Sequence, residues 1–175
     1  MYSKVVSVLT SQDGSNNQDI TFTPNGTDPS WTPKVAIVQW SRANTSADTF
    51  QAHCGYGKGF TDGTNQRCCS ISSEGLAQAR GDTATIQRNN ALICALNPSG
   101  TVTTVDCVAT FSSWLTNGMR INWSVTPAAQ FYMTDMFLGG SDLTNASVGT
   151  LMSTNVTSGT ISVTNLAYQP DVANF

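Results

Sequence analysis

The sequence predicts an all-β protein, a jelly-roll-like sandwich of two antiparallel sheets. Apolar and polar residues alternate with a period of two in segment after segment, and each run ends at residues that favour turns. Thr, Val, Ile and aromatic residues, which pack well on a pleated sheet, recur along these runs. Residues typical of exposed helix faces are scarce, because the chain has one glutamate, Glu74, and three lysines, Lys4, Lys34 and Lys58. We therefore expect less than about 10% helix, confined to one or two turns near residues 73–80.

The predicted strands follow one another at the spacing typical of sandwiches. They cover residues 1–10, 20–22, 35–40, 66–73, 91–96, 105–111, 119–125, 130–138, 146–152 and 159–164. Asn117-Gly118 is the hairpin signal, and Asn97-Pro98-Ser99-Gly100 forms a strong turn. The stretches at 42–52 and 74–90 have no clear period, so we expect surface loops there.

A chain of 175 residues can bury one core, and residues 1–159 are predicted to form a single sandwich domain. Residues 160–175 are expected to form a C-terminal strand or extended tail. This tail repeats the pattern of residues 19–38, an alternating strand, a turn and then aromatic-x-Pro-x-Val-Ala. Two interpretations stay open: a coincidence between two Thr-rich strands, or the start of a second repeat in a longer native chain.

The alternation also predicts which large apolar side chains form the core. The predicted core residues are Val35, Ile37, Phe111, Ile121, Trp123 and Phe137. Trp40 alternates with Val and Ile in the same way and is assigned to the core as well.

Charge and hydropathy exclude several classes of function. The formal net charge is −3, and the eight Lys and Arg residues are scattered, so no basic patch is available for nucleic acid. No apolar run approaches the roughly 18 residues of a membrane-spanning helix. The apolar patch near the N-terminus is too short for a signal peptide. We therefore expect no nucleic-acid partner, no membrane partner and no signal peptide.

The sequence contains no constellation that predicts catalysis or metal binding. His53 is the only histidine, and no nucleophile-elbow motif surrounds it. His53 with Cys54 and the adjacent Cys68-Cys69 lacks the Cys-x-x-Cys spacing of common zinc sites. Asp106 and Asp135 could be drawn as a carboxylate pair, but nothing around them favours it. We expect no enzymatic activity, no cofactor and no metal, and the five cysteines are interpreted as buried thiols, with one disulfide as the alternative.

Four aromatic residues are candidate interface or ligand contacts. Trp31 and Trp114 lie near predicted turns, where an indole ring can stay accessible. Tyr168 and Phe175 lie in the tail, where they would leave an apolar stripe in need of a cover. The tail strand could close its own sandwich or add to a neighbouring subunit, and we favour the second.

Four stretches carry a resemblance to a known group of proteins. WTPKVAIVQW, QRCCSISSEG, FSSWLTNGMRINWSV and FLGGSDLTNASVGTL are similar to sequences in a family of uncharacterised β-rich proteins of tailed bacteriophages and prophages. The resemblance spans most of residues 19–152, and its motifs are structural. It implies a place in the virion and assigns no chemistry to any residue.

Composition points to the same hypothesis as the resemblance. Charged residues make up 11% of the chain, against roughly 25% in ordinary soluble domains, so mutual repulsion between copies is weak. We expect a virion structural protein, a capsid-decorating, head or tail-surface component, made in the host cytoplasm and located in the virion. Its partners would be copies of itself and other virion proteins. The alternative is a carbohydrate- or receptor-binding module that contacts a host surface glycan through exposed aromatic rings.

Overall fold

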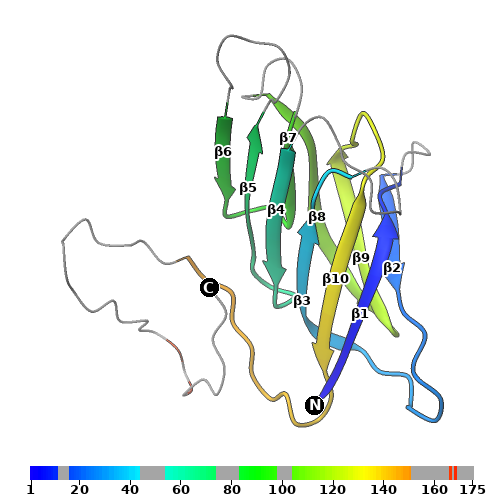
Figure 1. Ribbon diagram of the computed structural model, residues 1–175. Coiled ribbons are helices and arrows are strands. Elements are labelled where there is room, and N and C mark those ends of the chain that lie inside the picture. The colour runs from blue at the N-terminus through cyan, green and yellow to red at the C-terminus, as the bar shows by residue number, and fades with distance from the viewer. Residues whose placement is uncertain are drawn as a thin grey trace.

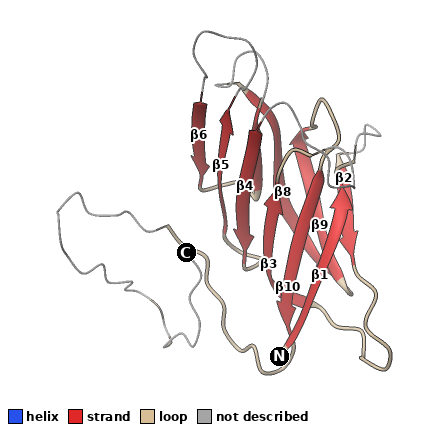
Figure 2. Cartoon of the chain, in the orientation of Figure 1, coloured by secondary structure: helices blue, strands red, loops and turns tan. Residues whose placement is uncertain are grey.

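The computed structural model describes residues 1–11, 16–43, 54–73, 83–97, 104–150, 166 and 168. This part of the chain contains ten strands. Figure 2 shows strands and loops but no helix among the described residues. The strands form two antiparallel sheets that lie face to face (Figure 1). The prediction of an all-β antiparallel sandwich is therefore confirmed.

The larger sheet has six strands and the smaller sheet has four. In spatial order the larger sheet contains β1 (Tyr2–Leu9), β10 (Tyr132–Gly139), β3 (Pro33–Trp40), β4 (Cys54–Thr61), β5 (Gln66–Ser73) and β6 (Thr83–Arg88). The smaller sheet contains β2 (Asn17–Thr21), β9 (Gly118–Val125), β8 (Val105–Leu115) and β7 (Ile93–Leu96). β10 lies between β1 and β3, and β9 lies beside β2, so early and late strands are neighbours in both sheets, as in a jelly roll. β3 to β6 instead run as a meander within the larger sheet.

The core lies between the two sheets and contains four of the seven predicted core residues. Trp40, Ile121, Trp123 and Phe137 are all at most 2% exposed within it. Ile37 is buried too, but it is outside this core cluster, because side chains alternate along β3 and its neighbour Ala36 points inward. Ile37 is therefore covered on the other side of the sheet.

Val35 and Phe111 correct the prediction, because each is only partly buried. Val35 lies two residues before Ile37 and so shares its outward side of β3. Phe111 lies beside a register irregularity of β8, which interrupts the inward alternation. Its ring instead contacts the Trp114 ring, with the two centroids 4.6 Å apart.

Two strands occur where the sequence predicted none. β4 has no predicted counterpart, because Gly55, Gly57 and Gly59 take the places where an apolar residue would mark a strand. β6 lies inside the stretch 74–90 that was expected to be a loop. The strand was not predicted because its partly buried positions hold Ala84, Ile86 and Arg88, of which only Ile86 is a large apolar residue. Hydrogen bonding to β5 organises this weakly patterned segment as a strand.

Other expectations fail or lie outside the described residues. Residues 146–150 form no strand, contrary to the strand expected at 146–152. Ser73 ends β5 rather than opening a helix. The rest of the expected helical turn, the strand at 159–164 and most of the loop at 42–52 lie outside the described residues.

The turn between β8 and β9 differs by one residue from the predicted hairpin turn. Leu115 pairs with Gly118, so the loop consists of Thr116 and Asn117, and Asn117 adopts a left-handed φ of 63°. Gly118 is the first residue of β9, where a Cβ would lie only 2.1 Å from the carbonyl oxygen of Ile20. The glycine therefore permits the close approach of β2 to β9.

The glycines of β4 let two neighbours pack directly on its backbone. A Cβ at Gly57 would lie 2.0 Å from an atom of the Trp40 ring. A Cβ at Gly59 would lie 1.8 Å from the carbonyl oxygen of Leu92, just before β7. The missing side chains therefore allow β4 to carry both the Trp40 ring and the start of β7 in close contact.

We expect Gly59→Ala to lower the free energy of unfolding by about 1–3 kcal/mol, because the Leu92 backbone must move to admit a methyl group. Gly149→Ala is the matched control, since a Cβ there meets no atom within 4 Å. Urea unfolding of both variants measures the difference. Wild-type stability in Gly59→Ala would contradict the close packing of β7 on β4.

Candidate functional site

One side of the larger sheet exposes an unusual number of large apolar side chains. We call the side that points away from the smaller sheet the outward face. It carries Val5, Tyr56, Ile71 and Met136, whose exposed fractions are 56%, 46%, 41% and 37%. Contiguous exposed apolar surface of this kind is typical of interaction sites.

Strand register brings several of these side chains into one row. Val5 on β1 lies opposite Met136 on β10, and Met136 lies opposite Ile37 on β3. Ile37 in turn lies opposite Phe60 on β4. Side chains directly opposite one another on the same side of a sheet are in contact distance. The four residues therefore form a continuous apolar row across four strands, and its large members explain why Ile37 is only 8% exposed.

A second apolar pair lies on the same face, four residues further along β4. Tyr56 on β4 pairs with Ile71 on β5. Between this pair and the first row, Lys58 pairs with Cys69. The Lys58 ammonium lies 4.9 Å from the centroid of the Phe60 ring, so its positive charge rests against the apolar row.

The outward face carries positive charge and lacks negative charge. Lys58 and Arg67 lie on the outward sides of β4 and β5. Asp135 is the one acidic residue in the six strands, and it is completely buried on the other side of the sheet. A partner surface would therefore meet apolar groups and cations, with no carboxylate that has to be neutralised.

The exposed side of the smaller sheet has a different chemistry. Arg120 donates two hydrogen bonds to Asp19, of 2.6 and 2.8 Å, and these hold the pKa of Asp19 below its usual value. Asn122 donates a 3.0 Å hydrogen bond to Asn17. These polar groups satisfy one another across β2 and β9, so this side offers less apolar surface to a partner.

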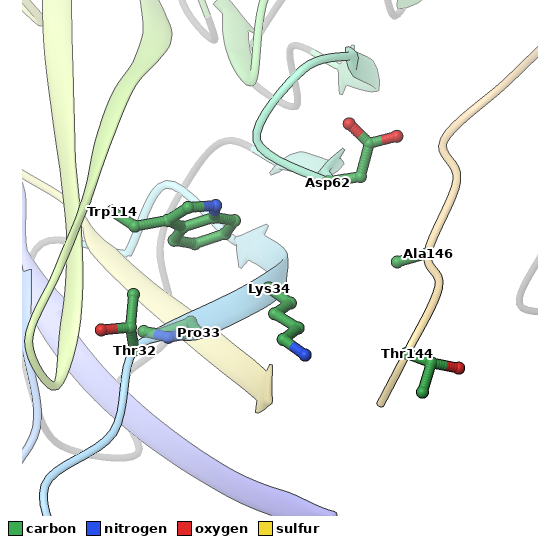
Figure 3. Close-up of a pocket in the computed structure, with 7 residues that line it drawn as sticks. All are labelled: Thr32, Pro33, Lys34, Asp62, Trp114, Thr144 and Ala146. Carbon is green, nitrogen blue, oxygen red and sulfur yellow. The ribbon is translucent and has the colours of Figure 1, made fainter. Parts of the chain in front are cut away.

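A groove of about 390 Å³ lies at one end of the sandwich (Figure 3). Its lining residues are Thr32, Pro33, Lys34, Asp62, Trp114, Thr144 and Ala146. The Trp114 indole lies on one side of the groove and the backbone that carries Thr144 and Ala146 lies on the other. It is an open groove in the surface, not an enclosed cavity.

The segment 143–150 that forms one wall is tied to the sandwich by three hydrogen bonds. The Lys34 ammonium donates to the Leu143 carbonyl oxygen at 2.6 Å. The backbone N–H of Val148 donates to Asp62 at 2.8 Å, and Arg67 donates to the Thr150 hydroxyl at 3.1 Å. The wall is therefore fixed along most of its length.

Asp62 serves this wall rather than the open groove. Burial alone would raise the pKa of Asp62, but hydrogen bonds from the Asn65, Thr64 and Val148 backbone and from the Asn65 side chain outweigh it and lower the pKa. A carboxylate with four donors is well satisfied. It holds the β4–β5 turn and the 143–150 segment together in its charged form.

The Trp114 ring is held in position by two neighbours. Phe111 packs against it at a 57° tilt. At Gly63, where φ is +89°, a Cβ would lie 2.5 Å from Trp114 Nε1, so the turn backbone lies directly against the indole. The ring is only partly buried, and its orientation is set before any ligand arrives.

The structure does not bring the four predicted contact residues together. Trp31 is partly buried in an aromatic cluster, stacked on Tyr2 at 5.8 Å and packed against Phe22 at 4.6 Å. Trp114 lines the groove. Tyr168 is partly buried, and Phe175 lies outside the described residues.

The cysteines and carboxylates of the described residues do not form a cluster that could hold a metal ion. Cys68, Cys94 and Cys107 are buried free thiols, and burial raises the pKa of Cys68 and Cys107 to about 12. Cys69 points to the opposite side of β5 and is exposed, which corrects the expectation of buried thiols at that position. A protonated buried thiol is a poor nucleophile.

The two carboxylates that might have paired are in different environments, and the only histidine lies outside the described residues. Asp106 forms an ion pair with Arg42, in which both side chains are 8% exposed. Asp135 has no hydrogen-bond partner among the described residues.

No family model, no curated protein and no solved structure matches this chain. Within the described part of the chain, no helix is long and apolar enough to span a membrane. The outward face and the Trp114 groove are the two candidate functional surfaces of the described residues.

Proposed function

We propose that this chain is a structural protein of a bacteriophage virion, a capsid-decorating, head or tail-surface component that assembles with copies of itself and with other virion proteins. The observation that carries the proposal is the outward face, where apolar residues line up across adjacent strands. The sequence resemblance to phage proteins supports the same function.

The outward face suits association between copies of the chain. Burial of apolar surface contributes about 25 cal/mol per Å², and a sheet face can present such surface over several strands at once. The chain has a formal net charge of −3, and Lys58 and Arg67 contribute two positive charges to the outward face. The remaining residues therefore carry a net charge of −5 and are acidic relative to this face. A second copy can therefore approach the outward face with a more acidic part of its surface, in a head-to-tail arrangement that continues from copy to copy.

We expect Met136→Lys and Ile71→Lys to abolish self-association, because each places an ammonium group in the apolar surface that would be buried. Sedimentation velocity over a concentration series should show assemblies of the wild type and an 18.6 kDa monomer for both variants. Ser124→Lys, on the exposed side of the smaller sheet, is the matched control and should assemble like the wild type. A wild type that stays monomeric, or equal assembly of all four proteins, would contradict the proposal.

A further inference from the structure

The groove beside Trp114 is lined by none of the exposed apolar residues of the outward face and calls for a separate ligand. It combines one immobilised indole and the Lys34 ammonium in a groove of about 390 Å³. Figure 3 shows the Lys34 side chain between the indole and the opposite wall, with the hydroxyls of Thr32 and Thr144 directed away from this space. A flat apolar ring beside hydrogen-bonding groups is the environment that suits a sugar, which has apolar C–H faces and a rim of hydroxyls.

The charges of the groove indicate that the ligand is neutral. Lys34 contributes one positive charge and Asp62 one negative charge, so the lining has no net formal charge. Asp62 accepts four hydrogen bonds from the protein, and Lys34 already donates one to Leu143. An anionic ligand would find one shared ammonium next to a carboxylate, and a cation would find a carboxylate that is already satisfied.

We propose that the Trp114 groove binds a neutral saccharide, with the indole contacting a sugar ring and the Lys34 ammonium hydrogen bonding to its hydroxyls. The site is preformed, because Phe111 and the Gly63 backbone fix the indole and three hydrogen bonds fix the 143–150 wall. Little ordering is then required on binding, which favours affinity. The inference goes beyond assembly and does not depend on it, since none of the apolar residues of the outward face lines the groove; the two surfaces share only Arg67, which lies on that face and also holds Thr150 of the wall.

The test is binding of the full chain to an immobilised panel of neutral oligosaccharides built from glucose, galactose and N-acetylglucosamine, alongside sialylated and sulphated members. We expect retention of at least one neutral oligosaccharide. Isothermal titration with that oligosaccharide should show a loss of about tenfold or more in affinity for Trp114→Ala, the loss of one good contact. Trp114→Phe keeps an aromatic ring in the groove and should lose less.

Three controls keep the outcome decisive. Thermal unfolding shows whether Trp114→Ala is folded, and if it is not, Trp114→Phe takes its place in the titration. Asn122→Ala, on the exposed side of the smaller sheet, should bind like the wild type. Met136→Lys should bind the saccharide even though it does not assemble, which separates this inference from the proposed function. The proposal is overturned if no neutral oligosaccharide binds, if only acidic glycans bind, or if the groove variants bind as well as the wild type.

Discussion

Asp135→Asn is expected to stabilise the protein at pH 8 and above and to remove most of the dependence of its stability on pH. Asp135 is completely buried on β10, and neither carboxylate oxygen has a hydrogen-bond partner among the described residues. Its cross-strand neighbours are Val6 on β1 and Val38 on β3, so neither strand places a charge opposite it. Burial therefore raises the pKa of Asp135 to about 8.

The sign of the effect follows from the two protonation states. In the unfolded chain an aspartate has a pKa of about 3.9, so between about pH 4 and pH 8 the native state holds a proton that the unfolded state has lost. The contribution of Asp135 to the free energy of unfolding is therefore most favourable below about pH 4. This contribution is lost as the pH rises toward 8. Four pKa units correspond to about 5 kcal/mol, which is an order-of-magnitude upper value.

The measurement is the free energy of unfolding in urea from pH 4 to pH 9 for the wild type and Asp135→Asn. Near pH 4 the two proteins should be similar, because asparagine resembles the protonated acid. At pH 9 the variant should be more stable by several kcal/mol, up to about 5. Asp28→Asn, at an exposed position, is the control and should follow the wild-type curve. Parallel curves for Asp135→Asn and the wild type would show that the buried carboxyl does not control the pH dependence.

Trp123→Ala is expected to lower the free energy of unfolding by about 3–5 kcal/mol. Trp123 is 1% exposed and is the largest of the fully buried side chains. Its indole Nε1 donates a 3.1 Å hydrogen bond to the Gln18 side chain, whose amide in turn donates to the Leu9 carbonyl oxygen. Truncation leaves a cavity and also removes the hydrogen bond by which Trp123 on β9 is linked to Gln18 on β2.

Guanidinium or urea unfolding of Trp123→Ala measures this loss. Trp114→Ala is a useful comparison, because its ring is only partly buried and its removal should cost less. A midpoint for Trp123→Ala equal to that of the wild type would show that Trp123 does not anchor the core.

The sequence predicted the fold class because local alternation is enough to specify a half-buried strand. It predicted Ile121 and Trp123 as core for the same reason, since β9 alternates without interruption. It did not predict β4, where Gly57 and Gly59 replace side chains with the Trp40 ring and the Leu92 backbone. Those contacts come from segments distant in sequence, so no local pattern reports them.

The candidate surfaces were less accessible to sequence reasoning than the core. Trp114 was identified as a candidate contact from its place near a turn, and it does line a groove. The outward face was missed, because strand pairing is needed to show that Val5 and Met136 are neighbours. The signal that was available is the large apolar residue at a position where alternation expects a polar one, such as Ile71 between Ser70 and Ser72 on β5.

The central claim is that copies of the chain associate through the outward face. Oxidative footprinting of the assembled protein by hydroxyl radicals tests this claim most directly. Tyr56 and Met136 both lie on that face and react readily when exposed, while Met1 and Tyr2 are exposed elsewhere and serve as internal references. We expect oxidation of Tyr56 and Met136 to fall sharply in the assembled wild type relative to the monomeric variants. Tyr56 is compared with Met136→Lys, and Met136 is compared with Ile71→Lys, so that each measured residue is unchanged. Met1 and Tyr2 should be oxidised equally in the assembled and monomeric proteins. Undiminished reactivity of Tyr56 and Met136 in the assembled protein would contradict the claim.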